Sequence, residues 1–445
     1  MIFLFNITAF RPIVLMAEGL KYIQAAAPFL IRAANCYINP GLLVNAAYCT
    51  YTYRSGGKMS QEKPNSPLEK PRRAAYIGSP ELFSRGASAI HVMKMCQAMG
   101  RLGIETDLIL ATPGNTPDIR AYYGVDYTFK IIQFPYFKSS FVRNVFHGIR
   151  AGVYLGMRKG MYDITVTRNI VYAFLAAKVF GMPVVYDAHH PLVTGARPLF
   201  RAIKDSPNLV RFSTNTRGLA DIYLGEGLPP EKLAVAHNGV DLERYAYLPK
   251  KEEARKKLGL SLDKDIICYS GNIYEGRGIE LLIDASLRLP DAKFLIVGGR
   301  DEDVLRYRQL AAQKNASGFK LTSYVSHDLV PLYLAAADVL VMPYTSAMTI
   351  RGGTVATDFT SPIKLFEYMA SGRPIVATSL PSVNELLRDG ENAVVVPPDS
   401  ADALYEGLSR ALKDSGLAGR IASGALADAR GYTWEERVKK VLGFK

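Results

Sequence analysis

The residues with the clearest chemical potential begin a predicted helix within the segment SPIKLFEYMASGRP, residues 361–374. We expect Ser361 to be the N-cap and Pro362 the first helical residue, which puts Lys364 in the first turn. A cation there is unfavourable, because the positive end of the helix dipole repels it. It becomes favourable if a phosphate binds to both the cation and the free backbone N–H groups. Glu367 follows on the same face, where a carboxylate beside a phosphate suits the hydroxyls of a ribose. An ordinary surface Lys–Glu pair is the alternative, and these two residues alone do not decide.

A second basic residue, Arg277, stands directly before another predicted helix, which begins near Gly278. The preceding loop, GNIYEGRG, contains Gly271 and Asn272, where the backbone can approach a ligand closely. One diphosphate held between the two helix starts would explain both misplaced charges. Neither GxxxxGK followed by Ser or Thr nor a complete GxGxxG is present, which argues against a P-loop ATPase and a dinucleotide dehydrogenase.

The length and composition of the chain indicate the number of domains and the class of partner. The chain has 445 residues, which suits two domains, and its 49% hydrophobic and 21% charged content is that of a globular protein. A net charge of +13 favours anionic partners, namely nucleotides, acidic membrane surfaces or nucleic acid. Nucleic acid ranks last, because the chain has no zinc-finger spacing and no RNP-type motif. The four cysteines lack paired spacing, as in reduced thiols of a cytosolic protein.

The N-terminal region differs from the rest. Residues 1–58 are apolar but interrupted by charges and prolines, which makes a poor transmembrane helix and a poor signal peptide. Met59 opens a polar run and is a candidate for the true start. We therefore interpret residues 1–72 as an extension, either disordered or loosely associated with a membrane.

From Arg73 onward, strands and helices alternate as in parallel α/β sheets. A charged linker near residues 245–263 separates two such units, and the strand pattern restarts after it. Two doubly wound units place a ligand crevice at the carboxyl ends of both sheets. The expected strands are 74–77, 107–111, 127–134, 163–167, 183–187, 233–236, 266–270, 293–297, 319–321, 339–342, 375–377 and 393–396.

The chain from Arg73 to the C-terminus resembles retaining glycosyltransferases of family 4, the glycosyl transferases group 1, and its motifs occur in the same order as in that family. The resemblance rests on SRGASAIHVMKMCQAMGRLGIETDLI, VVYDAHHP, HNGVDLERY, SGNIYEGRGIELLIDA, LIVGG, YLAAADVLVMPY, SPIKLFEYMASGRPIVATSLPSVNELL and YTWEERVKKVL. It implies an α/β GT-B fold, with two Rossmann-like doubly wound domains facing across a cleft. It further implies an acceptor domain at 73–250, a nucleotide-sugar donor domain at 251–425, and a helix at 426–445 that crosses back to the first domain.

The resemblance also implies roles for single residues. Arg277 and Lys364 hold the donor diphosphate and stabilise the leaving nucleoside diphosphate, so that neither a metal nor another cofactor is required. Glu367 binds the ribose hydroxyls, with Ser361, Gly271 and Asn272 nearby. Gly86 approaches the diphosphate from across the cleft. His189 lies near the donor sugar, through a ring nitrogen or its backbone carbonyl; for a strand-ending histidine, a purely structural role is the alternative, and His190 is its neighbour.

One position departs from the family pattern. The family often has a second glutamate eight positions before the ribose-binding one, and here that position is Phe359. Asp358 is a candidate replacement, and backbone N–H groups near Ser361 are another. The Gly-rich segment 344–360 is expected to cover the donor, with Arg351 as a further phosphate contact, or else to be a plain surface loop.

Together these features predict a metal-independent retaining hexosyltransferase that uses a nucleotide-sugar donor and a glycan or lipid-linked acceptor, in surface polysaccharide or glycolipid synthesis. A nucleotide-sugar 2-epimerase of the same fold and a non-catalytic nucleotide-sugar-binding scaffold are the alternatives. The expected location is cytoplasmic, with peripheral contact to the anionic inner face of the cell membrane, and no nucleic-acid partner is expected.

Overall fold

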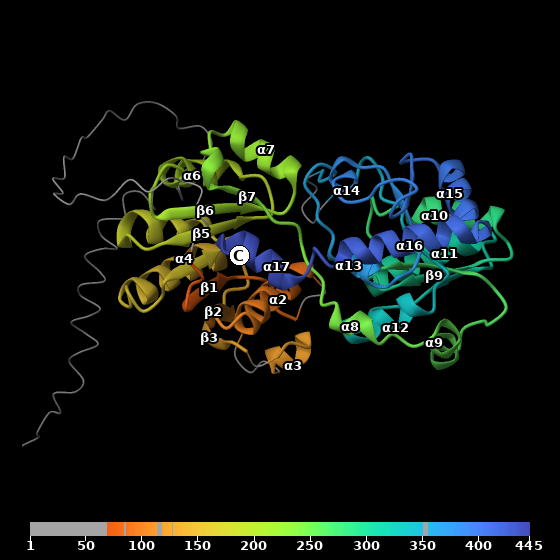
Figure 1. The fold of residues 1–445 in the computed structure, drawn as a ribbon, viewed down its shortest axis with the longest axis horizontal. Helices are drawn as coiled ribbons and strands as arrows, with labels where there is room; N and C mark the ends of the chain where they lie inside the picture. Colours follow the sequence, from red (N-terminus) through yellow and green to blue (C-terminus); the bar gives the residue numbers. More distant parts are fainter. Residues whose placement is uncertain (1–68, 84–85, 114–117, 127, 350–354) are drawn as a thin grey trace, which may run out of the picture.

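The computed structural model describes residues 69–83, 86–113, 118–126, 128–349 and 355–445, arranged as two α/β halves side by side (Figure 1). The expectations for residues 1–58, Met59 and Arg351 lie outside the described residues. Within the described ranges, no helix is both long enough and apolar enough to cross a bilayer.

The first half is built on a seven-stranded parallel sheet of order β3-β2-β1-β4-β5-β6-β7. Its strands are β1 (Arg73–Gly78), β2 (Glu105–Thr112), β3 (Lys130–Pro135), β4 (Ile164–Thr167), β5 (Val184–Ala188), β6 (Leu209–Thr214) and β7 (Leu233–Val235). The order reverses between β1 and β4, so a crevice opens at their carboxyl ends.

Among the described residues, the α-helices that follow the strands of the first sheet are α2 (Ala87–Arg101), α3 (Ile119–Tyr123), α4 (Ser140–Gly156), α5 (Ile170–Phe174), α6 (Arg197–Ile203), α7 (Arg217–Gly225) and α8 (Glu243–Ala246). Helix α2 follows directly on the loop after β1, and its buried face includes His91 and Lys94.

The second half repeats the design with a six-stranded parallel sheet of order β10-β9-β8-β11-β12-β13. Its strands are β8 (Ile266–Ser270), β9 (Lys293–Val297), β10 (Phe319–Leu321), β11 (Val339–Met342), β12 (Ile375–Thr378) and β13 (Val394–Val396). The switch in strand order lies between β8 and β11. The two parallel sheets confirm the predicted α/β class.

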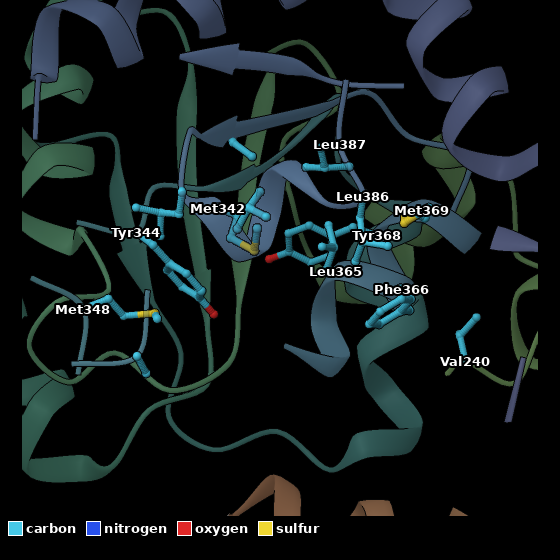
Figure 2. Packing of buried hydrophobic residues seen from close by; sticks show 14 of the residues in the cluster. Val240, Met342, Tyr344, Met348, Leu365, Phe366, Tyr368, Met369, Leu386 and Leu387 are labelled. Atoms are coloured by element: carbon cyan, nitrogen blue, oxygen red, sulfur yellow. The ribbon is translucent and has the colours of Figure 1, made fainter. Parts of the chain in front are cut away.

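The helices of the second half are α9 (Lys251–Leu258), α10 (Ile279–Arg288), α11 (Asp301–Gln313), α12 (Val330–Ala335), α13 (Ile363–Ala370), α14 (Pro381–Asn384), α15 (Ala401–Lys413) and α16 (Ser415–Ala429). Helix α16 continues through residue 425, where we expected the second domain to end. Figure 2 shows the core between these elements, with Tyr344 beside Met348 and Tyr368 from α13 opposite them.

The chain then returns to the first half. Helix α17 (Trp434–Leu442) packs against α2 and strands β5, β6 and β7 (Figure 1). The turn after β7 meets it, since Val240 N–H donates to the Tyr432 carbonyl at 2.9 Å and Val240 pairs with Thr433. A Cβ on Gly239 would lie 2.7 Å from the Trp434 nitrogen, so the HNGVD turn needs glycine for this close approach.

Helix α5 continues into a π-helical segment, Leu175–Phe180. Two local predictions were wrong. Strand β6 was missed, because Arg211 interrupts its apolar run. The N-cap of α13 is Pro362 rather than Ser361.

Candidate functional site

Lys364 lies at the start of α13, and its buried ammonium group contacts aromatic rings. Its Nζ is 3.7 Å from the centroid of the Tyr269 ring and 5.4 Å from that of Tyr344. Among the described residues, no group accepts a hydrogen bond from it. Burial, and next the charge of Arg277, lower the pKa of Lys364 well below its ordinary value. An anion at this site would reverse that effect.

Arg277 sits before α10, as predicted, and its guanidinium is sandwiched between two aromatic rings. The carbon Cζ is 4.6 Å from the centroids of both Tyr274 and Tyr344. Nη2 donates to the Tyr274 hydroxyl, and Nη1 lies 3.1 Å from the Met348 sulfur. No carboxylate in the described part of the chain forms an ion pair with it. The Tyr344 ring is therefore shared by Arg277 and Lys364, which brings both predicted phosphate-binding cations to one place.

Glycines allow this convergence. Gly278 is the N-cap of α10 at φ +71°, and a Cβ there would lie 1.7 Å from the Pro343 carbonyl oxygen. Gly271 has φ +121°, and its Cβ would lie 2.7 Å from Lys364 Nζ. Lys364 thus occupies the space that a side chain at position 271 would fill. The carbonyl of Asn272 accepts the Tyr269 hydroxyl at 2.5 Å, which holds the loop against the same ring.

Glu367 is buried on the next turn of α13 and already has a partner. Its Oε1 lies 2.7 Å from His327 Nε2, and His327 in turn contacts Arg244, with 2.7 Å between Nδ1 and Nη1. Burial by itself raises the pKa of Glu367, but His327, with Arg244 and Lys364, holds it below its ordinary value. The carboxylate is thus ionised, and any ribose bound to it shares it with His327.

Ser361 and Asn238 join the two halves at the entrance of α13. Asn238 N–H donates to Ser361 Oγ at 3.2 Å, and Asn238 Nδ2 donates to the Ser361 carbonyl at 2.5 Å. The Ser361 hydroxyl therefore bonds to the HNGVD turn of the first half. This contact explains why it does not cap the helix.

The structure places the other predicted residues in different surroundings. Gly86 is the N-cap of α2 at φ −98° and ψ 140°, a conformation open to any residue. Asp358 is exposed, and its backbone carbonyl leaves no room for a Cβ on Gly218 of α7. Phe359 is 6% exposed and packs in the core. Tyr344 and Met348, at the start of the expected donor-covering segment, are buried in the core rather than on the surface.

His189 follows β5 and faces a buried ionic network. Its Nε2 is 3.0 Å from Asp187 Oδ2 and 3.2 Å from Arg437 Nη2, which belongs to α17. Burial, with the nearby charge of Arg168, lowers the pKa of His189 to about 3, so its ring is neutral at physiological pH. Asp187 also accepts hydrogen bonds from Arg437 at 2.8 Å and from Ser213 at 2.7 Å.

His91, Asp187 and His189 lie close enough together for their side chains to hold a metal ion. The Arg437 guanidinium contacts both Asp187 and His189, however. A cation bound to these atoms would have to displace it, so the residues fit an arginine-centred network better than a metal.

Sequence reasoning missed five residues around Arg277, Lys364 and Glu367: Tyr269, Tyr274, Tyr344, His327 and its partner Arg244. Apart from Tyr274, they lie far along the chain from the residues they contact, and His327 is 40 residues from Glu367. It also missed Glu385, whose carboxylate accepts the N–H groups of Arg217 at 2.8 Å and Gly218 at 3.1 Å. That residue ties the start of α7 to the second half.

Two family models match the chain. One, described as Glycosyltransferase Family 4, matches residues 88–244, and the other, Glycosyl transferases group 1, matches residues 264–414. Together they span more than half of the chain, in the order expected from the motifs.

Curated relatives agree with these models. The chain is 26% identical over 422 residues to a D-inositol 3-phosphate glycosyltransferase of Streptomyces bingchenggensis, covering 82% of this chain and 87% of that protein. It is 26% identical over 273 residues to an alpha-D-kanosaminyltransferase of Streptomyces kanamyceticus, covering 57% and 67%.

Solved structures show the same fold. A glycosyltransferase from Rickettsia africae superposes with a TM-score of 0.66 at 14% identity, covering 83% of this chain and 96% of the other. Anabaena HepE in complex with UDP and glucose superposes with a TM-score of 0.63 at 17% identity, covering 83% and 97%. The chain is therefore a glycosyltransferase of the GT-B fold and belongs to the family 4 type.

Proposed function

We propose that this enzyme transfers a hexose from a nucleoside-diphosphate sugar to a glycan or lipid-linked acceptor with retention of configuration. The observation that carries the proposal is the pair of cations, Arg277 and Lys364, placed on one tyrosine ring without a carboxylate partner in the described part of the chain. Buried charges are normally paired, so a dianionic diphosphate is the natural complement of this pair.

Charge development explains why such a pair aids catalysis. In the transfer, the bond from the anomeric carbon to the β-phosphate oxygen breaks and its electron pair leaves with the nucleoside diphosphate. The acceptor hydroxyl oxygen bonds to the anomeric carbon, and its proton passes to the leaving phosphate. Negative charge on the diphosphate grows in the transition state, so Arg277 and Lys364 stabilise that state more than the bound donor. In this proposal they supply the role that a metal ion has in other transferases.

Glu367 and His189 complete the proposed roles. The ionised Glu367, held by His327, accepts hydrogen bonds from the ribose hydroxyls. His189 is neutral and locked by Asp187 and Arg437, so we assign it a positioning contact to the donor sugar instead of proton transfer.

The test combines binding and turnover on the full chain. Thermal unfolding with UDP, GDP and ADP should show stabilisation by one of the three, and a screen of the matching nucleotide sugars in EDTA should show hydrolysis or transfer. Stabilisation without turnover of any sugar donor would favour the non-catalytic scaffold. No stabilisation by any of the three nucleotides would contradict the diphosphate site.

A further inference from the structure

A cavity of about 570 Å³ opens in the first half, at the carboxyl ends of β1, β4 and β5. Every residue that lines it belongs to that half. The cation pair of the donor site is not part of its wall. The cavity is therefore separate from the diphosphate site, while His189 lines its edge.

One wall of this cavity is apolar. Helix α4 contributes Phe141, Val142, Val145 and Phe146, and the segment after β5 contributes Leu192 and Val193. Phe146 and Val193 are 47% and 61% exposed, so they form part of the solvent edge. Exposed large apolar side chains around a cavity indicate a ligand with an apolar part.

The polar part of the cavity wall carries one positive charge. Arg168, at the end of β4, donates to Ser88 Oγ at 3.2 Å, and no carboxylate of the described residues pairs with it. The single acidic residue among those that line the cavity, Asp187, is fully buried and bonded to Arg437. Burial and Arg168 lower the pKa of His189 to about 3 and that of His190 to about 4, so both rings are neutral. The polar wall thus has a net positive charge.

We propose that the acceptor is an amphipathic anion, with its apolar body against α4 and its anionic group, a phosphate or carboxylate, on Arg168. This inference rests on the proposed function, because it gives the chemical class of the acceptor for the transfer. A guanidinium binds such oxyanions through parallel N–H donors, and the α4 wall removes the apolar body from water. His189 lines the same cavity and is therefore within reach of the bound acceptor.

The test uses three soluble probes with the full chain, below their micelle concentrations. Octyl phosphate has both features, octyl glucoside has the same tail without charge, and glycerol phosphate has the charge without the tail. By calorimetry, octyl phosphate should bind at least about 10-fold more tightly than either of the others. Equal affinity for octyl phosphate and octyl glucoside would overturn the proposal.

Two variants locate the binding. Arg168→Gln should weaken octyl phosphate by about 10- to 100-fold and leave octyl glucoside unchanged. The matched control is Arg158→Gln, which removes an arginine stacked 3.8 Å over Tyr154 outside the cavity and should change neither. Phe146→Ser should weaken octyl phosphate but not glycerol phosphate. Full octyl phosphate affinity in Arg168→Gln would contradict the assignment.

A lipid and a soluble acceptor share this chemistry, and vesicles separate the two sources. Co-sedimentation with phosphatidylcholine vesicles that contain a long-chain alkyl phosphate, lost in Arg168→Gln, would identify a membrane acceptor; octyl phosphate binding without vesicle binding would identify a soluble one. Nucleotide stabilisation of Arg168→Gln is measured in parallel. Normal stabilisation of this variant shows that the substitution leaves the donor site intact. If a nucleotide stabilises the wild type but octyl phosphate does not bind the wild type, the acceptor inference fails and the donor site stands.

Discussion

Two buried lysines show how the two halves of the molecule use positive charge. In the first half, Lys94 directs its ammonium to Asp241 at 2.7 Å, to the Gln97 side chain at 3.1 Å and to the Gly124 carbonyl at 3.2 Å. In the second half, Lys364 has an aromatic ring at 3.7 Å and no acceptor in the described part of the chain. A satisfied cation supports the fold, whereas a buried cation without an acceptor lowers stability, which agrees with our proposal that Lys364 binds the donor diphosphate.

Two buried arginines, Arg437 and Arg277, differ in the same way as the two lysines. Arg437 is buried against Asp187 and the His237 carbonyl, and it fastens α17 to the first sheet. Arg277 is buried against tyrosines and a methionine sulfur. Aromatic faces stabilise a guanidinium without neutralising it, so its charge remains available to a ligand.

The largest expected difference is in stability. Lys94→Met should lower the free energy of unfolding by about 3–5 kcal/mol, because it leaves Asp241 buried and unpaired. Lys364→Met should leave the stability of the free protein unchanged or raise it, since it removes an uncompensated charge. Urea unfolding of both variants without nucleotide measures this. Equal destabilisation by both substitutions would contradict the claim that Lys94 stabilises the fold and Lys364 does not.

A pH titration sharpens the same comparison. The pKa of Lys364 is lowered by folding, so protonation of this residue favours the unfolded chain. The stability of the free wild type should therefore rise, relative to Lys364→Met, as pH increases through the folded-state pKa toward the ordinary value of 10.5. Thermal unfolding of both proteins over that range gives the difference. A gap that stays constant with pH would mean that Lys364 is not perturbed.

Catalysis should depend on Arg277 more than binding does. Arg277→Ala should lower kcat by about 100- to 1,000-fold, with a smaller loss of donor affinity, because the charge on the leaving group grows in the transition state. Donor hydrolysis kinetics separate the two effects. If KM changes and kcat does not, Arg277 serves only in binding.

Glu367→Ala should weaken nucleotide binding by about 10- to 100-fold, the cost of losing hydrogen bonds to a charged acceptor. Calorimetry with the nucleotide that stabilises the wild type measures the loss. His327→Gln, which removes the partner at 2.7 Å and keeps Glu367, should have a smaller effect. Unchanged affinity in Glu367→Ala would remove this residue from the site.

Gly271→Ala should have the smallest effect, about 10-fold weaker nucleotide binding, because its Cβ would displace the Lys364 ammonium. Gly259→Ala is the matched control, at φ +60° with open space around its Cβ. Both variants place an alanine at a positive φ and so lose stability through backbone strain. Nucleotide affinity should fall in Gly271→Ala alone. The same affinity in both would separate Gly271 from Lys364.

Much of the second half could be predicted from sequence. Strands β8, β9, β10 and β11 begin and end where they were predicted, because buried parallel strands are short apolar runs between turn residues. Arg277 and Lys364 could be singled out because each opposes a helix dipole, which is a local signal. The structure places both beside the Tyr344 ring, and their role in phosphate binding stays a proposal.

The rest depends on contacts between distant segments. The Tyr344 ring between Arg277 and Lys364, the His327–Glu367 pair and the Asn238–Ser361 link join residues 20 or more positions apart, and no local pattern specifies them. Ser361 was misassigned as a cap for this reason, since a tertiary partner competes for its hydroxyl. The cavity beside α4 escaped notice because exposed phenylalanines on a helix do not reveal what they face.

Arg277 and Lys364 together bind a diphosphate in our proposal, and calorimetry tests this most directly. UDP, GDP and ADP are titrated into wild type and Lys364→Met at pH 8, in two buffers of different ionisation enthalpy. We predict that one nucleotide binds the wild type with net proton uptake, as the lowered pKa of Lys364 returns toward its ordinary value, and that Lys364→Met loses both the uptake and most of the affinity. Equal binding by both proteins, without uptake in either, would contradict the account.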